Sequence, residues 1–201
     1  MTVEVDAKKV AAHAPKAEFK KKWNLVPANH PLLSTKLENF DLKNPPVDPV
    51  ELATDMLAHM RYFGGIGLSA NQLGLPFNMF VLGDHPGMEK GLKMTCFNPM
   101  IISASADQVM MKEGCLTFPF VFLNISRPRK VTVKYEDENG DLKEGHLDGM
   151  ISRVFQHEYD HMLGKTFVDG VSKMKLDMAY KKAEKQMKKY KKMREQTIIK
   201  K

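Results

Sequence analysis

Residues 157–161 read His-Glu-Tyr-Asp-His, and this H-E-x-x-H motif restricts the local structure to a helix. His157 and His161 are four residues apart, so in a helix both imidazoles project from one face and can bind one ion. The flanking residues favour a helix, because Asp148 can cap its start and Gly164 can end it. The motif in this setting predicts a metal site on a helix.

Glu158 follows the first histidine and is offset from it by about 100° around the helix. Its carboxylate would lie near the ion without having to bind it. A carboxylate in this position can move a proton while a bond is hydrolysed. The motif therefore predicts a metal-dependent hydrolase and leaves the third metal ligand open.

The third ligand distinguishes the classes of metallohydrolase. In one class a third histidine follows at the position that Phe167 holds here, which excludes that class. Another class uses a downstream glutamate, but Glu184 and Glu195 both lie among lysines near the end of the chain. The upstream segment EGCLT offers Cys115 as a thiolate ligand. The alternative for this cysteine is a small thiol buried in the core.

A third segment, GIGLSANQ at residues 65–72, is rich in glycine. It does not match G-x-G-x-x-G, because Ala70 stands at the third glycine, so a dinucleotide site is not expected. Its glycines would let a substrate backbone approach and pair as an added strand. Gln72 could donate its amide N–H to an oxyanion. The alternative is a glycine-rich turn after a helix.

The order of the predicted elements favours an α+β fold. Strands and helices do not alternate as βαβ units, so we expect mainly antiparallel strands packed around the central H-E-x-x-H helix, followed by a C-terminal helix. Asn139-Gly140 predicts a two-residue hairpin turn. The predicted helices are 49–62, 149–163 and 172–195, and the predicted strands are 78–82, 94–97, 109–112, 130–136 and 141–147.

Charge divides the chain into a body and a basic tail. Of the 31 Lys and Arg residues 12 lie in residues 171–201, against 3 of the 24 Asp and Glu residues, which leaves the rest of the chain nearly neutral. We expect a polar arm over 1–22, a catalytic domain over 23–170 and a basic helix over 171–201. The chain has no apolar run of the roughly 20 residues that span a bilayer and no secretory signal, which predicts a cytoplasmic protein.

Three of these segments together resemble the signature motifs of the peptide deformylases. GIGLSANQ is similar to Gly-φ-Gly-φ-Ala-Ala-x-Gln, EGCLT to Glu-Gly-Cys-φ-Ser and HEYDH to His-Glu-x-Asp-His, where φ is apolar. The motifs occur in this order, and the resemblance covers roughly residues 25–170. Two positions depart from the patterns, because Ser69 replaces the first alanine and Thr117 replaces the serine.

The resemblance implies an activity and a metal. Peptide deformylases hydrolyse the formyl group from the N-terminal formylmethionine of newly made polypeptides and release formate. The resemblance implies that Cys115, His157 and His161 bind one divalent metal, natively Fe(II), which zinc, nickel or cobalt can replace. These ligand types suit several of those metals.

The resemblance also implies roles for other residues. Glu158 would pass a proton to the leaving amine, while Gln72 and the backbone N–H of Leu116 would stabilise the oxyanion. The residues expected to bind the peptide backbone are Ile66, Gly67 and Gly114. Met150 and Val154 would line the methionine pocket, with plain core packing as their alternative.

Three charged residues near these segments belong to the same expectation. We expect Arg127 to pair with Glu113 and Asp160 to orient the same network, with a surface pair as the alternative. Arg153, on the central helix, is expected to alter the rim of the methionine pocket.

The basic tail carries one narrow apolar stripe, formed by Leu176, Tyr180, Ala183, Met187 and Tyr190. One interpretation is a helix packed along the domain with a solvated basic face. The other is binding to an anionic surface, with ribosomal RNA favoured over membrane. For the whole chain, two further functions stay open: a different metallohydrolase such as a peptidase, and a nucleic-acid-binding module.

Overall fold

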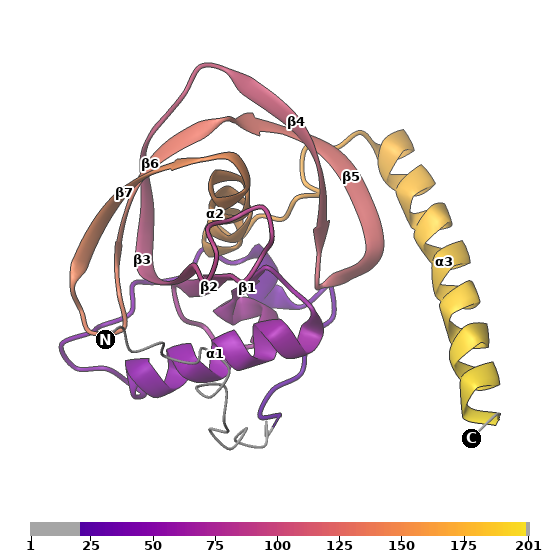
Figure 1. Ribbon diagram of the computed structural model, residues 1–201, viewed down its shortest axis with the longest axis horizontal. Helices are drawn as coiled ribbons and strands as arrows, with labels where there is room; N and C mark the ends of the chain where they lie inside the picture. Colours follow the sequence, from indigo (N-terminus) through magenta and orange to yellow (C-terminus); the bar gives the residue numbers. More distant parts are fainter. Residues whose placement is uncertain (1–20, 200–201) are drawn as a thin grey trace, which may run out of the picture.

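The central helix of the fold is the one that carries the H-E-x-x-H motif. The computed structural model describes residues 21–199, so nearly all of the predicted arm over 1–22 lies outside the described residues. Figure 1 shows the central helix α2 (Gly149–Met162) enclosed by strands, with α1 (Pro49–Phe63) below it and α3 (Lys173–Ile199) along one side. The α+β class with a C-terminal helix is confirmed.

Seven strands and two short 3-10 helices complete the fold of residues 21–199. The strands are β1 (Gly67–Ser69), β2 (Met79–Gly83), β3 (Lys93–Ala104), β4 (Gln108–Cys115), β5 (Phe118–Pro128), β6 (Lys130–Glu136) and β7 (Leu142–Asp148). The 3-10 helices are η1 (Pro31–Ser34) and η2 (Ala70–Leu73). All strand pairs are antiparallel, as predicted.

The strands form a five-stranded sheet and a separate pair. The sheet has the order β1-β2-β3-β6-β7, so β1 is an edge strand, and the pair is β4-β5. The predicted hairpin at Asn139-Gly140 is confirmed, because it joins β6 to β7. Its turn is longer than the two residues expected, since Asp137 N–H donates to Asp141 O across three residues, of which Gly140 has φ 83°. The sequence did not predict β1 or β5, and β3 is longer than expected.

The backbone at both ends of α2 follows the expected capping chemistry. The Asp148 side chain accepts a hydrogen bond from the N–H of Gly149 at 2.6 Å. At the other end Gly164 has φ 68° and donates to His161 O, while Lys165 donates to Asp160 O. This pair of bonds is a Schellman motif, which ends the helix directly after the second histidine.

Apolar side chains hold α2 against the five-stranded sheet. Phe155 packs edge-on against Phe80 of β2, with ring centroids 5.0 Å apart, and both rings are fully buried. Val154 of the helix and Val133 of β6 belong to the same cluster. The helix therefore sits on one face of the sheet and presents its histidines to the other side, toward the β4-β5 pair.

Helix α3 packs on β5 through part of its apolar stripe. Ala183 is buried in a cluster with Phe118 and Val121 of β5, and the Tyr190 ring lies 5.7 Å from that of Phe120. The lysines of α3 whose side chains are described are all exposed: Lys173, Lys175, Lys181, Lys182, Lys185, Lys188, Lys189, Lys191 and Lys192. This arrangement fits a helix packed along the domain with a solvated basic face.

Between residues 21 and 199, no helix has both the length and the apolar character needed to cross a membrane.

We predict that Gly164→Ala will destabilise the fold strongly. An added Cβ at this left-handed position would lie 2.7 Å from the backbone carbon of Thr35, so strain and a backbone clash act together. The free energy of unfolding should fall by at least about 3 kcal/mol, measured by denaturant titration.

Gly140→Ala is the matched control for this prediction. Gly140 has φ 83° and nothing within 4 Å of an added Cβ, so only the left-handed penalty of about 1 kcal/mol applies. Equal losses in the free energy of unfolding for Gly164→Ala and Gly140→Ala would contradict the expected clash between an added Cβ at the end of α2 and residues 34–35.

Candidate metal centre

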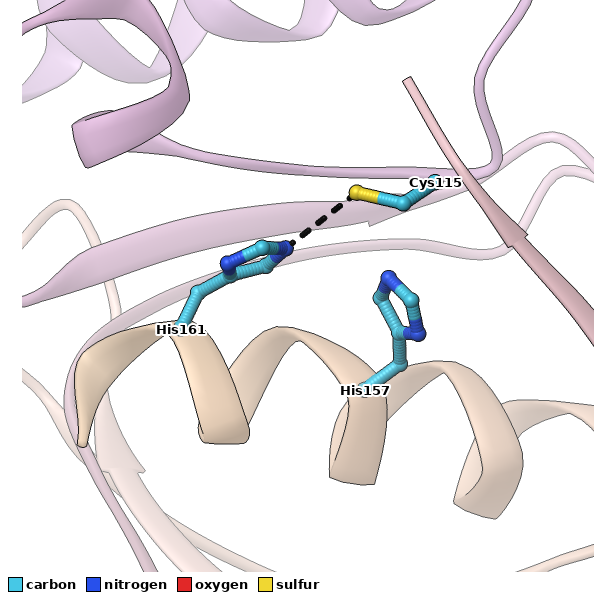
Figure 2. A group of neighbouring side chains, drawn as sticks. All are labelled: Cys115, His157 and His161. Atoms are coloured by element: carbon cyan, nitrogen blue, oxygen red, sulfur yellow. Dashed lines mark hydrogen bonds between the residues drawn. The ribbon is translucent and has the colours of Figure 1, made fainter. Parts of the chain in front are cut away.

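Three side chains from two elements meet at the open side of α2. Figure 2 shows His157 and His161 projecting from the helix toward Cys115, which is the last residue of β4. Their ligand atoms all lie within 4.8 Å of one another, and Cys115 Sγ is 3.4 Å from His161 Nε2. The structure thus brings together the three residues that the sequence predicted as metal ligands.

The register of β4 against β5 breaks beside the cysteine. Gly114 pairs with Phe122 and Cys115 with Phe118, so residues 119–121 of β5 have no partner on β4. Phe120 among them has φ 65°. Extra residues of this kind bend the strand that carries them, which here is β5. An added Cβ at Gly114 would lie 2.7 Å from the Phe122 ring, which would have to shift.

The donor set fits a divalent transition metal. Tetrahedral coordination at ordinary metal–sulfur and metal–nitrogen lengths places ligand atoms about 3.5 Å apart. The distance from Cys115 to His161 already has this value, and the wider separations close with side-chain shifts of about 1 Å. One thiol and two imidazoles with an open fourth position are typical of a catalytic rather than a structural site.

The two histidines differ in charge because their neighbours differ. Burial lowers the pKa of His157, but hydrogen bonds with Cys115 and Glu113 outweigh it and raise that pKa to about 10. Burial, with the charges of His157 and Arg127, lowers the pKa of His161 to about 3. The cluster thus holds a proton on His157 that a divalent cation could replace, since metal binding to such sites releases protons.

Glu113 holds the first histidine in place. Its Oε2 lies 2.9 Å from His157 Nδ1, which leaves Nε2 to face Cys115 and His161. A carboxylate behind a ligating imidazole fixes the tautomer and the ring orientation. Burial raises the pKa of Glu113, but hydrogen bonds from His157 and Arg127 outweigh this effect and lower it to about 2.

Arg127 and Arg153 both neutralise the buried carboxylate of Glu113. Arg127 donates from Nε to Glu113 Oε1 at 2.7 Å and from Nη2 to Oε2 at 3.1 Å, and its Nη1 reaches Asp160 at 2.7 Å. The expected pairing of Arg127 with Glu113, and the part of Asp160 in the same network, are confirmed.

Arg153 borders the pocket beside the cluster, as expected, but its side chain is only 5% exposed. Its Nη1 donates to Glu113 Oε1 at 2.8 Å and to the carbonyl of Ile125. A buried guanidinium needs such partners, and the carboxylate of Glu113 supplies one with opposite charge.

Gln72 lies beside the cluster with its amide fixed. Its Oε1 accepts a hydrogen bond from the N–H of Ser69 at 3.0 Å, and its Nε2 donates to Thr117 Oγ1 at 3.0 Å and to Cys115 Sγ at 3.2 Å. One amide hydrogen therefore points toward Cys115 of the metal cluster and the other toward Thr117. Thr117, which replaces the serine of the family pattern, also supplies a hydroxyl at this position.

Glu158 is buried on the other side of the cluster. Its side chain is among the buried polar groups at 4% exposure, and burial raises its pKa. Ser69 Oγ donates to its Oε2 at 2.6 Å. A buried carboxylate with a raised pKa next to a metal cluster is a typical proton carrier in hydrolases.

A pocket of about 620 Å³ opens onto these groups. The predicted substrate-binding residues all line it: Ile66, Gly67, Gly114, Met150 and Val154. Leu116 lines it too, as do Gln72, Cys115, His157 and Glu158. Met150 and Val154 also belong to the apolar cluster under α2, so pocket lining and core packing both describe them.

Ser69 and Arg153 are site residues whose contacts sequence reasoning missed. Both were visible in the sequence as departures, one from a family motif and the other from an apolar surrounding. Such a departure marks a position where a polar group needs a buried partner. The partners, Glu158 for Ser69 at 89 positions and Glu113 for Arg153 at 40 positions, follow only from the fold.

Comparison with known proteins agrees with this arrangement. The family model described as Polypeptide deformylase matches residues 23–177. The chain belongs to the peptide deformylase family. It is an enzyme, a hydrolase that removes the formyl group from the N-terminus of peptides.

Individual relatives agree with the peptide deformylase assignment. The chain is 38% identical to the peptide deformylase of Bartonella tribocorum over 140 residues, which cover 69% of this chain and 79% of that one. It is 39% identical to that of Mesorhizobium japonicum over 135 residues, with 67% and 77% covered.

Solved structures of peptide deformylases match the fold. The Legionella pneumophila structure has a TM-score of 0.74 at 30% identity and covers 83% of this chain and 95% of its own. The Synechococcus elongatus structure, in complex with actinonin, has a TM-score of 0.72 at 30% identity, with 91% and 93% covered.

We predict that Glu113→Gln will weaken metal binding. The amide can still accept from His157, but it leaves Arg153 buried without a counter-charge and Arg127 with Asp160 alone. Metal affinity should fall by about 10–100-fold, measured by competition with a chromogenic chelator. The free energy of unfolding should fall by about 3 kcal/mol.

Asp160→Asn is the control, because it also removes one carboxylate from the network. The Asp160 side chain is 26% exposed and binds only the outer edge of Arg127. Its loss should change metal affinity by less than about threefold, as for a solvent-screened pair. Wild-type metal affinity in Glu113→Gln would show that the carboxylate does not position His157.

Proposed function

We propose that Cys115, His157 and His161 hold the divalent metal with which this enzyme removes the formyl group from N-terminal formylmethionine. The observation that carries the assignment is the meeting of these three ligands beside the buried Glu158 at the end of one pocket. We propose Fe(II) as the native metal, with zinc, nickel or cobalt as substitutes, because thiolate and imidazole ligands accept all of them. The bound ion would lower the pKa of water toward neutrality and polarise the formyl carbonyl.

Glu158 would carry the proton of the reaction. Its carboxylate takes a proton from the attacking water and gives it to the amine as the formyl C–N bond breaks. The raised pKa of Glu158 suits both steps, since the group must accept and then release a proton near neutral pH. The products would be formate and a peptide with a free N-terminal methionine.

Gln72 and Leu116 would stabilise the oxyanion that forms on the formyl carbon. The Gln72 amide is held by Ser69 and Thr117, so its Nε2 needs little reorganisation to face developing charge. Leu116 follows Cys115 directly, which places its backbone N–H next to the cluster. Fixed donors of this kind typically contribute about 3 kcal/mol each to the barrier.

The formylated peptide would bind as an added strand. Strand β1 has a free edge in the five-stranded sheet, and the pocket lies between this edge and the end of β4. Ile66, Gly67 and Gly114 border the pocket with their backbone, as strand addition requires. Met150 and Val154 would contact the methionine side chain. We propose that residues 23–170 carry all of this machinery.

The test is formate release from formyl-Met-Ala-Ser by protein loaded anaerobically with Fe(II) or with Ni(II). We predict turnover by the wild type and a loss of at least about 100-fold in kcat for Glu158→Gln at unchanged metal content. Internal cleavage of unformylated peptides, the activity of the rival peptidase, should be absent. Metal-loaded wild type that releases no formate would contradict the proposed function.

We further propose that the exposed basic face of α3 binds ribosomal RNA, which would place the enzyme in the cytoplasm where new chains emerge. The proposal is supported by the 12 Lys and Arg residues in residues 171–201 and by the exposure of the α3 lysines. Such a surface binds phosphate and releases counterions, so its affinity falls with salt.

Cosedimentation with ribosomes at increasing salt tests this partner. A variant with three exposed α3 lysines changed to glutamine should bind more weakly, with a salt dependence reduced by roughly one phosphate contact per lysine. The three are Lys181, Lys185 and Lys192.

The matched control removes the same charge from the body of the protein. It changes three exposed lysines of the body, Lys36, Lys43 and Lys90, to glutamine. Equal weakening by the two variants would reduce the effect to net charge and would eliminate α3 as the binding surface.

A further inference from the structure

The carboxylate of Glu158 lies against one face of the edge strand β1. Gly67 and Ser69 are two residues apart, so both face the same side of that strand, which packs on α2. Ser69 is fully buried, and its Oγ lies 2.6 Å from Glu158 Oε2. Among residues 21–199, the Ser69 hydroxyl is the one hydrogen-bond donor to the Glu158 carboxylate.

Gly67 confines the other carboxylate oxygen. A Cβ at this position would lie 2.3 Å from Glu158 Oε1 and 2.9 Å from its Cγ, so the side chain rests directly on the strand backbone. Contact with Gly67 limits the position of the carboxylate but does not fix its rotation about χ3, which is a soft torsion. The hydrogen bond from the Ser69 hydroxyl to Oε2 fixes that rotation.

We propose that Ser69 is a positioning residue of this enzyme, whose hydroxyl holds the Glu158 carboxylate in the orientation needed for proton transfer. The inference rests on the proposed role of Glu158 as proton carrier. A charge-assisted hydrogen bond in a buried place is both short and directional, and the contact at 2.6 Å has the length expected of one.

The hydrogen bond to Glu158 comes from a position at which this chain departs from the family pattern. The family pattern has alanine at this place, and a methyl group offers the carboxylate no hydrogen bond. The same residue also fixes Gln72, because its backbone N–H donates to Gln72 Oε1 and its side chain caps η2 at the Gln72 N–H. Replacing the side chain leaves the bond to the Gln72 side chain in place, since any amino acid except proline supplies that N–H.

The experiment compares wild type with Ser69→Ala in the metal-loaded enzyme. The variant should keep its metal content and a KM within about twofold, and should lose roughly tenfold in kcat on formyl-Met-Ala-Ser. Crystal structures of the two proteins should show one Glu158 carboxylate orientation in the wild type and more than one in the variant.

Ser152→Ala is the matched control for the loss of a buried hydroxyl. Ser152 is fully buried on α2 and accepts from Gln156 rather than from a reacting group. It should lose stability on the same scale as Ser69→Ala, with kcat unchanged.

Two results would each overturn the proposal: an unchanged kcat in Ser69→Ala, or a Glu158 carboxylate that keeps its single orientation there. The crystal structures also separate this proposal from the proposed function. If metal-loaded wild type releases no formate, the function fails, and the orientation of Glu158 still decides whether Ser69 holds it.

Discussion

The arrangement of the site depends on the buried carboxylate of Glu113. It joins the β4-β5 pair to helix α2, because it binds Arg127 of β5 and also His157 and Arg153 of the helix. Buried charges of this kind are costly unless every one of them is compensated. Cys115 lies two residues further along β4, so the same carboxylate sets how far the thiol stands from the helix.

Local backbone chemistry then brings the ligands to one point. The break in register between β4 and β5 lies beside Cys115, and the Schellman motif ends α2 directly after His161. Asn71 donates to the carbonyl of His161 at 2.9 Å, which ties η2 to the same helix end. The carbonyl of His161 therefore accepts from both Gly164 and Asn71, whereas Nδ1 of its ring has no hydrogen-bond partner among the described residues.

The sequence was sufficient for those parts of the structure that arise from local patterns. The helices, their caps and the Asn139-Gly140 hairpin follow from spacing and turn chemistry, and the three ligands follow from motifs. Strand β5 was not predicted, because Pro119 and Pro128 frame it and its aromatic residues alternate imperfectly between buried and exposed. The contacts of Ser69 and Arg153 were not predicted either, because their partners lie far along the chain and depend on how α2 meets the strands.

The two carboxylates of the site illustrate how environment assigns roles to one kind of group. Burial raises the pKa of both Glu113 and Glu158. For Glu113 the hydrogen bonds from His157 and Arg127 outweigh burial, so it stays ionised and serves as a fixed acceptor. Glu158 has only the neutral hydroxyl of Ser69 as a donor among the described residues, and its pKa remains raised. When the environment drives the pKa values of two carboxylates apart, the two groups take different roles. The carboxylate with the raised pKa is the one that can exchange a proton. The proposed role of Glu158 as proton carrier thus rests on burial and hydrogen bonding, independently of the motif in which Glu158 lies.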